Sequence, residues 1–156
     1  SRIDADPQRG APKVRSQTKA IVACTVVTAI VLLAADAVVI PLVMRPLFQA
    51  ALGEAMLDAL RLGPAVLFYA IHVGGLIWFA VLPALRAGSA RLAFINGAAL
   101  GLVAYSCYEM TSWTIMRDWH AGLVVTDVTW GAFISGLSSL CGFFAGNHMS
   151  SSQAVN

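Results

Sequence analysis

The sequence predicts an all-α fold, a polytopic integral membrane four-helix bundle, and three observations lead to that class. The chain of 156 residues is 58% hydrophobic and only 12% charged, whereas charged residues run near ~25% in soluble proteins. Four apolar stretches are each long enough for a helix that crosses the ~30 Å hydrocarbon core of a bilayer. Only short polar links separate the last three stretches, which favours antiparallel helix pairs.

The predicted transmembrane domain covers residues 20–146, with spans at about 20–43, 64–85, 92–116 and 121–145. Residues 1–19 and 147–156 form two polar tails, and tails of this composition are ordinarily disordered. The first span is too long for a secretory signal and contains Asp36, so we expect it to be retained.

Basic residues are distributed unevenly around the spans, and this predicts the orientation. Four crossings put both termini on one side, where Lys and Arg outnumber those of the opposite side by seven to three. The positive-inside rule then places both termini in the cytoplasm. The seven are Arg2, Arg9, Lys13, Arg15, Lys19, Arg86 and Arg91, and the three are Arg45, Arg61 and Arg117.

The segment between the first two spans, residues 44–63, has apolar residues at roughly helical spacing. Its charged residues Glu54, Asp58 and Arg61 occupy other positions. This pattern is typical of a short interfacial amphipathic helix. Such a helix would either cap the bundle on its outer surface or form a lid over a lipid-facing pocket.

Small residues predict where the helices approach closely, because glycine lets two backbones come together. Trp113 and Trp119 flank the outer end of the last hairpin, as expected of residues at the membrane interface. The glycines to which we assign a packing role are Gly97, Gly101, Gly131, Gly142 and Gly146.

One ionisable residue lies inside each span: Asp36, His72, Glu109 and Asp127. Counted from the outer end of each helix at ~1.5 Å per residue, all four lie ~10 Å below the outer boundary. No Lys or Arg occurs within a span. Because one charged carboxylate in hydrocarbon costs at least ~2.5 kcal/mol, we expect these side chains to face the bundle interior.

Helical spacing adds neighbours to these four residues. Tyr105 and Ser112 share a helix face with Glu109, and Trp130 follows Asp127 by three residues. The complete intramembrane polar layer predicted in this way is Asp36, His72, Tyr105, Glu109, Ser112, Asp127 and Trp130.

Three interpretations of the polar layer remain open. It is a hydrogen-bonded network that sets helix register, a proton or cation pathway, or a catalytic site with Asp127, Glu109, Tyr105 and His72 as candidates. No H-x-x-E or H-x-x-x-H pair is present, and the three cysteines match no zinc or redox spacing. We therefore assign no catalytic residue, metal site or cofactor, and we expect no nucleic-acid partner.

Several short motifs lie between Leu67 and Ala145. They are Leu-Phe-Tyr at 67–69, Gly-Leu-Val-Ala-Tyr at 101–105, Tyr-Glu-Met-Thr-Ser at 108–112 and Asp-Val-Thr-Trp-Gly at 127–131. Through these motifs the chain resembles, over about residues 20–146, a family of small bacterial membrane proteins catalogued as a domain of unknown function. The resemblance implies four helices and a bacterial cytoplasmic (inner) membrane location, but no established reaction or cofactor.

The resemblance also marks two departures. The family's typical block is Tyr-Asp-Leu-Thr-Asn, so Glu109 stands in place of an aspartate and Ser112 in place of an asparagine. Its Asp-x-x-Trp-Gly motif matches Asp127, Trp130 and Gly131, and Asp36 resembles the family's first-helix aspartate. Both departures fall in the polar layer, which favours a structural role for it in this chain.

The expected function is that of a small accessory or structural subunit of a larger bacterial inner-membrane assembly, for example a photosynthetic or respiratory complex. The bilayer would surround it, and other membrane protein subunits would hold its N-terminal tail. The first alternative is a membrane enzyme that acts on a lipid or other apolar substrate with Glu109 and Asp127 as acid and base. The second alternative is proton or cation transport.

Overall fold

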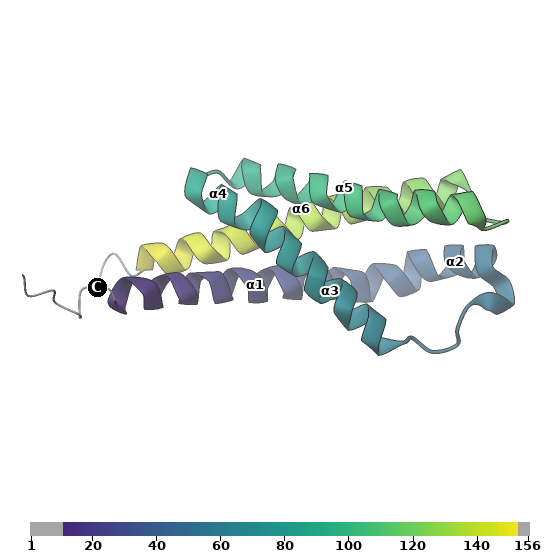
Figure 1. Ribbon diagram of the computed structural model, residues 1–156, viewed down its shortest axis with the longest axis horizontal. Coiled ribbons are helices and arrows are strands. Elements are labelled where there is room, and N and C mark those ends of the chain that lie inside the picture. The colour runs from purple at the N-terminus through teal and green to yellow at the C-terminus, as the bar shows by residue number, and fades with distance from the viewer. Residues whose placement is uncertain (1–10, 153–156) are drawn as a thin grey trace, which may run out of the picture.

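The computed structural model describes residues 11–152, with side chains from 17 to 149, and all regular structure in this range is helical. Four helical rods form the molecule (Figure 1). Each rod contains a stretch long and apolar enough to cross a membrane: Gln17–Ala55, Leu62–Ala87, Ala90–Ile115 and Ala121–Met149. The predicted fold class, a four-helix membrane protein, is confirmed.

The first two rods are each built from several helical segments. The first comprises α1 (Ala11–Val39), the π-helix η1 (Ile40–Met44) and α2 (Arg45–Leu52), and the short 3₁₀ helix η2 (Gly53–Ala55) follows it. The second comprises α3 (Leu62–Leu76), the π-helix η3 (Ile77–Val81) and α4 (Leu82–Ala87). The third and fourth rods are α5 (Ala90–Ile115) and α6 (Ala121–Ser152).

Helix α6 lies at the centre of the arrangement, alongside both α1 and α5, whereas α3 crosses α1 obliquely (Figure 1). The start of α1, the end of α6 and the α4–α5 turn lie at one end of the bundle, which we call the terminal end. Helix α2 and the α5–α6 turn lie at the other, the α2 end. An even number of crossings produces this arrangement. The cytoplasmic location of the terminal end stays a prediction.

The outer helices extend beyond the expected spans. Helix α1 begins at Ala11 and α6 ends at Ser152, so parts of both expected tails are helical. Five of the nine residues 11–19 are Ala, Lys, Arg or Gln, which are good helix formers and prolong a helix outside the membrane. The remaining tail residues, 1–10 and 153–156, lie outside the described residues.

A separate interfacial helix over residues 44–63 is not confirmed. Helix α2 continues α1 directly through η1, and residues 56–61 are not helical. The helix ends where Gly53 adopts a φ of 53°, a conformation that glycine adopts without steric cost. The apolar side of α2 covers the α2 end of the bundle, where the ring of Phe48 lies 5.4 Å from that of Trp119.

Proline residues explain the widened π-helical turns in the first two rods. Segment η1 contains Pro41 and precedes Pro46, and η3 precedes Pro83. A proline ring lacks an N–H and clashes with the carbonyl four residues earlier. For Pro83 that carbonyl belongs to Phe79, and it accepts a hydrogen bond from Asn96 Nδ2 of α5 at 3.2 Å. The neighbouring helix thus satisfies a backbone group that lipid would leave unpaired.

Residues that end or cap helices lie at the turns of both predicted hairpins. Gly88, with a φ of 62°, ends α4, and the Ser89 side chain caps α5 by accepting a hydrogen bond from the Leu92 N–H at 3.3 Å. At the α2 end, His120 Nδ1 accepts a hydrogen bond from the Leu123 N–H at 3.3 Å. Both links are short, and the helices that they join pack as antiparallel neighbours.

Helices α5 and α6 approach each other at glycines. A Cβ atom added at Gly97 would lie 2.7 Å from the Ser135 carbonyl oxygen, and one at Gly101 would overlap the Gly131 carbonyl. Gly131 in turn lies against the ring of Tyr105. A larger side chain at any of the three glycines would therefore push the helices apart.

The contact between α1 and α6 uses glycine in the same way. A Cβ atom at Gly142 would overlap the Thr28 hydroxyl, and one at Gly146 would overlap Cys24 Sγ. Both α1 residues are fully buried. Close packing along α6 therefore holds the first, third and fourth rods together and fixes the polar side chains between them.

A candidate binding site inside the bundle

A buried carboxyl group lies between α5 and the α5–α6 turn. Glu109 is fully buried, and its Oε2 accepts a hydrogen bond from Trp119 Nε1 at 2.7 Å. Its Oε1 has no partner among the described residues. The carboxyl of Asp127 on α6 lies close enough to Glu109 to interact with it. The two carboxyls therefore interact with each other, and Trp119 Nε1 is the one hydrogen-bond donor that Glu109 has among the described residues.

The two tryptophans at the α2 end of the last hairpin differ in exposure. Trp119 is only 3% exposed, whereas Trp113 is 44% exposed. The indole of Trp119 is covered by Phe48 of α2 and by Tyr108, whose rings lie 5.4 and 6.1 Å away. Helix α2 folds over this turn and buries Trp119, which donates its hydrogen bond to Glu109. The sequence pattern did not show this arrangement.

Asp36 joins three helices. Its Oδ1 accepts a hydrogen bond from Trp130 Nε1 of α6, and its Oδ2 accepts one from the Tyr69 hydroxyl of α3, each at 2.9 Å. Both carboxyl oxygens are therefore occupied. Hydrogen bonds between membrane helices of this kind fix the relative positions of the helices.

His72 lies in a third cluster. Its Nε2 is 2.9 Å from the Ser135 hydroxyl of α6. The ring stacks on Phe68 at 5.4 Å and meets the ring of Tyr105 edge-on at 6.0 Å. His72 thus contacts aromatic rings and one hydroxyl, not the carboxyl groups.

The structure distributes the predicted layer over several depths. Asp127, Trp130 and Ser135 mark the three clusters on α6. Ser135 follows Asp127 by eight positions, or ~12 Å along the helix axis. The expectation that all four ionisable residues lie at one depth assumed upright helices. Helix α3 instead crosses the bundle obliquely, and His72 therefore lies farther from the α2 end. Ser112 is buried next to Glu109 in the first cluster.

Three partners were missed in the sequence, namely Tyr69, Trp119 and Ser135. Ser135 was within reach of the spacing argument, because it lies four residues after Gly131 and eight after Asp127, on the same helix face. Tyr69 precedes His72 by three residues and offered a similar signal. Trp119 offered none, since its contact depends on the shape of a turn.

A cavity of about 470 Å³ opens between these clusters, and we call it the intramembrane cavity. This volume is in the range of small-molecule sites. Its walls are mainly apolar, with Met44, Phe48, Leu60 and Phe68 among them. The polar side chains that line it are Asp36, Tyr69, Tyr105, Tyr108, Asp127 and Trp130.

Asp127 and Tyr105 are the polar groups of this cavity that remain available. Apart from the interaction with Glu109, no described residue forms a hydrogen bond with the Asp127 carboxyl, and none does with the Tyr105 hydroxyl. Within residues 17–149, no group of three or more His, Cys, Asp or Glu side chains is arranged to hold a metal ion. The free groups suit hydrogen bonding to an organic ligand.

The four rods and the cavity between them define a class, a small membrane protein with a polar site among its helices. The chain belongs to the family described as "Predicted membrane protein (DUF2177)", whose model matches residues 21–144. All residues of the candidate site lie in the matched range. No curated protein and no solved structure matches the chain.

Proposed function

We propose that the protein binds a lipid or another apolar molecule in the intramembrane cavity and holds a polar group of that molecule at Asp127 and Tyr105. One observation supports this most directly. The cavity combines apolar walls with the Tyr105 hydroxyl, which no described residue satisfies, and with the Asp127 carboxyl, which interacts only with Glu109. Such convergent polar groups in an apolar pocket fix the orientation of a ligand.

The remaining polar groups have supporting roles in this proposal. Asp36 is held by Tyr69 and Trp130, so it shapes the wall between α1, α3 and α6. Glu109 does not line the cavity and acts only through Asp127. If the protein is an enzyme, Asp127 is the acid or base at the ligand, and Glu109 exchanges a proton with it as a positioning residue.

The test is to identify what co-purifies with the protein. The protein is extracted from its host in mild detergent, and mass spectrometry compares the bound apolar molecules with the bulk lipids. We expect one class to be enriched and Asp127→Asn to reduce that enrichment by at least about tenfold, since a hydrogen bond to a charged group contributes about 1.5–3 kcal/mol. Asp118→Asn, which changes an exposed acid in the α5–α6 turn, is the control. Bound lipid of bulk composition would contradict the proposal.

As a second candidate function, we propose that the protein is an accessory subunit of a larger bacterial inner-membrane assembly. Large apolar side chains stand out from the second rod, including Ile71, Trp78 and Phe79, of which Trp78 is 68% exposed. Another membrane helix could cover this face. Purification in mild detergent from the native host tests the idea, because a protein that migrates alone at about its own mass contradicts it.

A further inference from the structure

Two more cavities connect the intramembrane cavity with the α2 end of the bundle. The first, the middle cavity of about 560 Å³, shares Asp36, Phe48, Leu60 and Tyr69 with the intramembrane cavity. The second, the surface cavity of about 410 Å³, shares its wall with the middle cavity through Arg45, Met56, Leu57 and Asp58. Neighbouring cavities therefore share walls, from the surface cavity through the middle cavity to the intramembrane cavity.

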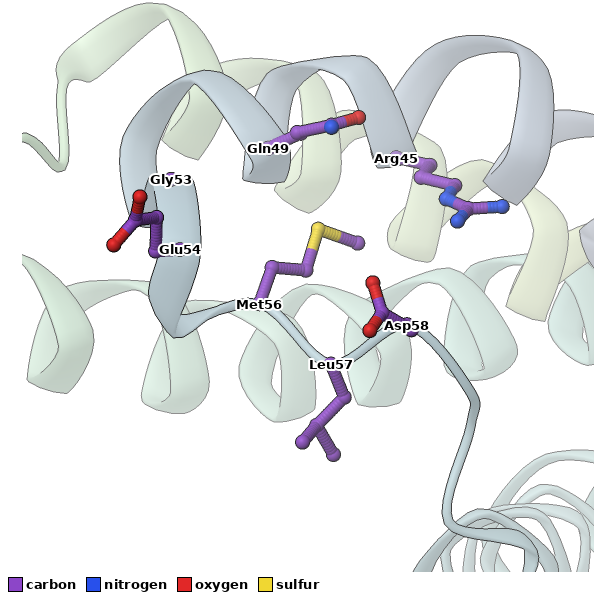
Figure 2. Close-up of a pocket in the computed structure, with 7 residues that line it drawn as sticks. All are labelled: Arg45, Gln49, Gly53, Glu54, Met56, Leu57 and Asp58. Carbon is purple, nitrogen blue, oxygen red and sulfur yellow. The ribbon is translucent and has the colours of Figure 1, made fainter.

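The surface cavity lies between α2 and the segment opposite it. Figure 2 shows Arg45 and Gln49 on α2, with Met56, Leu57 and Asp58 on the facing segment and Glu54 at the turn. The cavity thus contains one cation and two anions, all exposed. Within the described residues no ion pair joins Arg45 to Glu54 or Asp58. Both signs of charge are available to a ligand.

Polarity falls from the surface inward. Arg45 and Asp58 line both the surface cavity and the middle cavity. The residues that line the middle cavity alone or with the intramembrane cavity are mostly apolar, as are Leu33, Ile40 and Leu60. Asp36 lies nine residues before Arg45 on the continuous first rod, which separates their depths by ~13 Å. A molecule that fits this path has a charged head at the α2 end, a polar linking group that reaches Asp127 and Tyr105, and an apolar chain beyond them.

We propose that the ligand is a zwitterionic amphiphile, in which a phosphate binds Arg45 and an ammonium group binds Asp58, which lies on the same side of the cavity in Figure 2. The guanidinium of Arg matches phosphate geometry, and carboxylates attract ammonium. An anionic lipid without an ammonium group leaves the Asp58 carboxylate unpaired beside its own negative charge and is disfavoured. This inference rests on the proposed function, since it extends the intramembrane site to a whole ligand.

The experiment uses the full-length protein in nanodiscs and two photoreactive phospholipids with the same mid-chain diazirine. One probe is a phosphatidylethanolamine and the other a phosphatidylglycerol. We expect the phosphatidylethanolamine to label the cavity walls about three times more strongly than the phosphatidylglycerol does. The factor is small because interactions between exposed charges are weak. Arg45→Gln should lower this labelling, and Asp58→Asn should remove the preference. Arg61→Gln, on the same segment but outside all three cavities, should change neither.

The outcomes separate this inference from the proposed function. Equal labelling of the cavity walls by both probes, or an equal effect of Arg61→Gln and Arg45→Gln, overturns the headgroup site and leaves the intramembrane site intact. Failure of both probes to label residues of the intramembrane cavity overturns the amphiphile inference, and bound lipid of bulk composition in the co-purification experiment then overturns the proposed function as well.

Discussion

The carboxyl group of Glu109 depends on a single donor. Its Oε2 is bonded to Trp119 Nε1, and its Oε1 is unpartnered among the described residues. Substituting Trp119→Phe leaves the buried carboxyl without that hydrogen bond. We expect the free energy of unfolding to fall by about 1–3 kcal/mol, measured by denaturation in detergent micelles.

Two variants show whether this loss comes from the hydrogen bond. Trp113→Phe changes an exposed tryptophan of the same hairpin and should alter stability by less than ~0.5 kcal/mol. Trp119→Phe combined with Glu109→Met removes both partners, which is often nearly neutral. An equal loss in Trp113→Phe, or no recovery in the double variant, would show that the pair does not stabilise the protein.

The cavity proposal also makes a prediction at the scale of residues. Tyr105→Phe removes the free hydroxyl but keeps the ring that packs on Gly131. We expect stability to change little and the enrichment of the bound molecule to fall about fivefold, the effect of one neutral hydrogen bond of ~1 kcal/mol. Unchanged binding in co-purification would remove Tyr105 from the site.

Burial of the carboxyl residues was predictable, but their partners were not. Charged groups facing lipid are costly, and Asp36, Glu109 and Asp127 are all buried. The donors Tyr69 and Trp119 could not be assigned, because their positions depend on the tilt of α3 and on the fold of α2 over the α5–α6 turn.

Among the helices, α5 and α6 approach most closely at Gly101, where an added Cβ would overlap a backbone carbonyl. We expect Gly101→Ala to destabilise the protein by about 1–3 kcal/mol, because a backbone group cannot move aside as a side chain can. Gly74→Ala in α3 is the matched control, since a Cβ there meets nothing within 4 Å. Unfolding in micelles measures both, and equal effects would disprove the close contact.

The hydrogen bond between α5 and η3 allows a second test on helices. Asn96→Leu leaves the Phe79 carbonyl unpaired and should cost about 0.6–1.7 kcal/mol. Pro83→Ala restores the N–H that can bond to this carbonyl, so Asn96→Leu should cost little in the Pro83→Ala background. A double-mutant cycle measures the coupling, and strictly additive effects would refute it.

Helix positions followed from apolar length, but helix shapes did not. Four spans were evident because each crossing needs ~20 apolar residues. The periodicity of residues 44–63 suggested one separate helix, yet Gly53 ends α2 early and η1 joins α2 to α1. Periodicity records which side of a helix is apolar, not where a backbone turn interrupts it.

For the whole molecule, the orientation in the membrane remains a prediction. In a cysteine-free variant, Ala87→Cys lies at the terminal end and Asp118→Cys at the α2 end, both exposed. If the termini are cytoplasmic, a membrane-impermeant maleimide added to spheroplasts should label Asp118→Cys and not Ala87→Cys until the cells are lysed. The reverse pattern would show the opposite orientation.

The sequence by itself determined that the chain crosses a membrane four times and that its carboxyl groups turn inward, because the cost of polar groups in hydrocarbon depends on composition and span length alone. Only the tertiary structure decided which donors those carboxyls meet and where a cavity remains. These depend on the oblique crossing of α3, the proline-widened turns and the glycine contacts of α6. Such features arise from packing between helices, and no single stretch of sequence contains them.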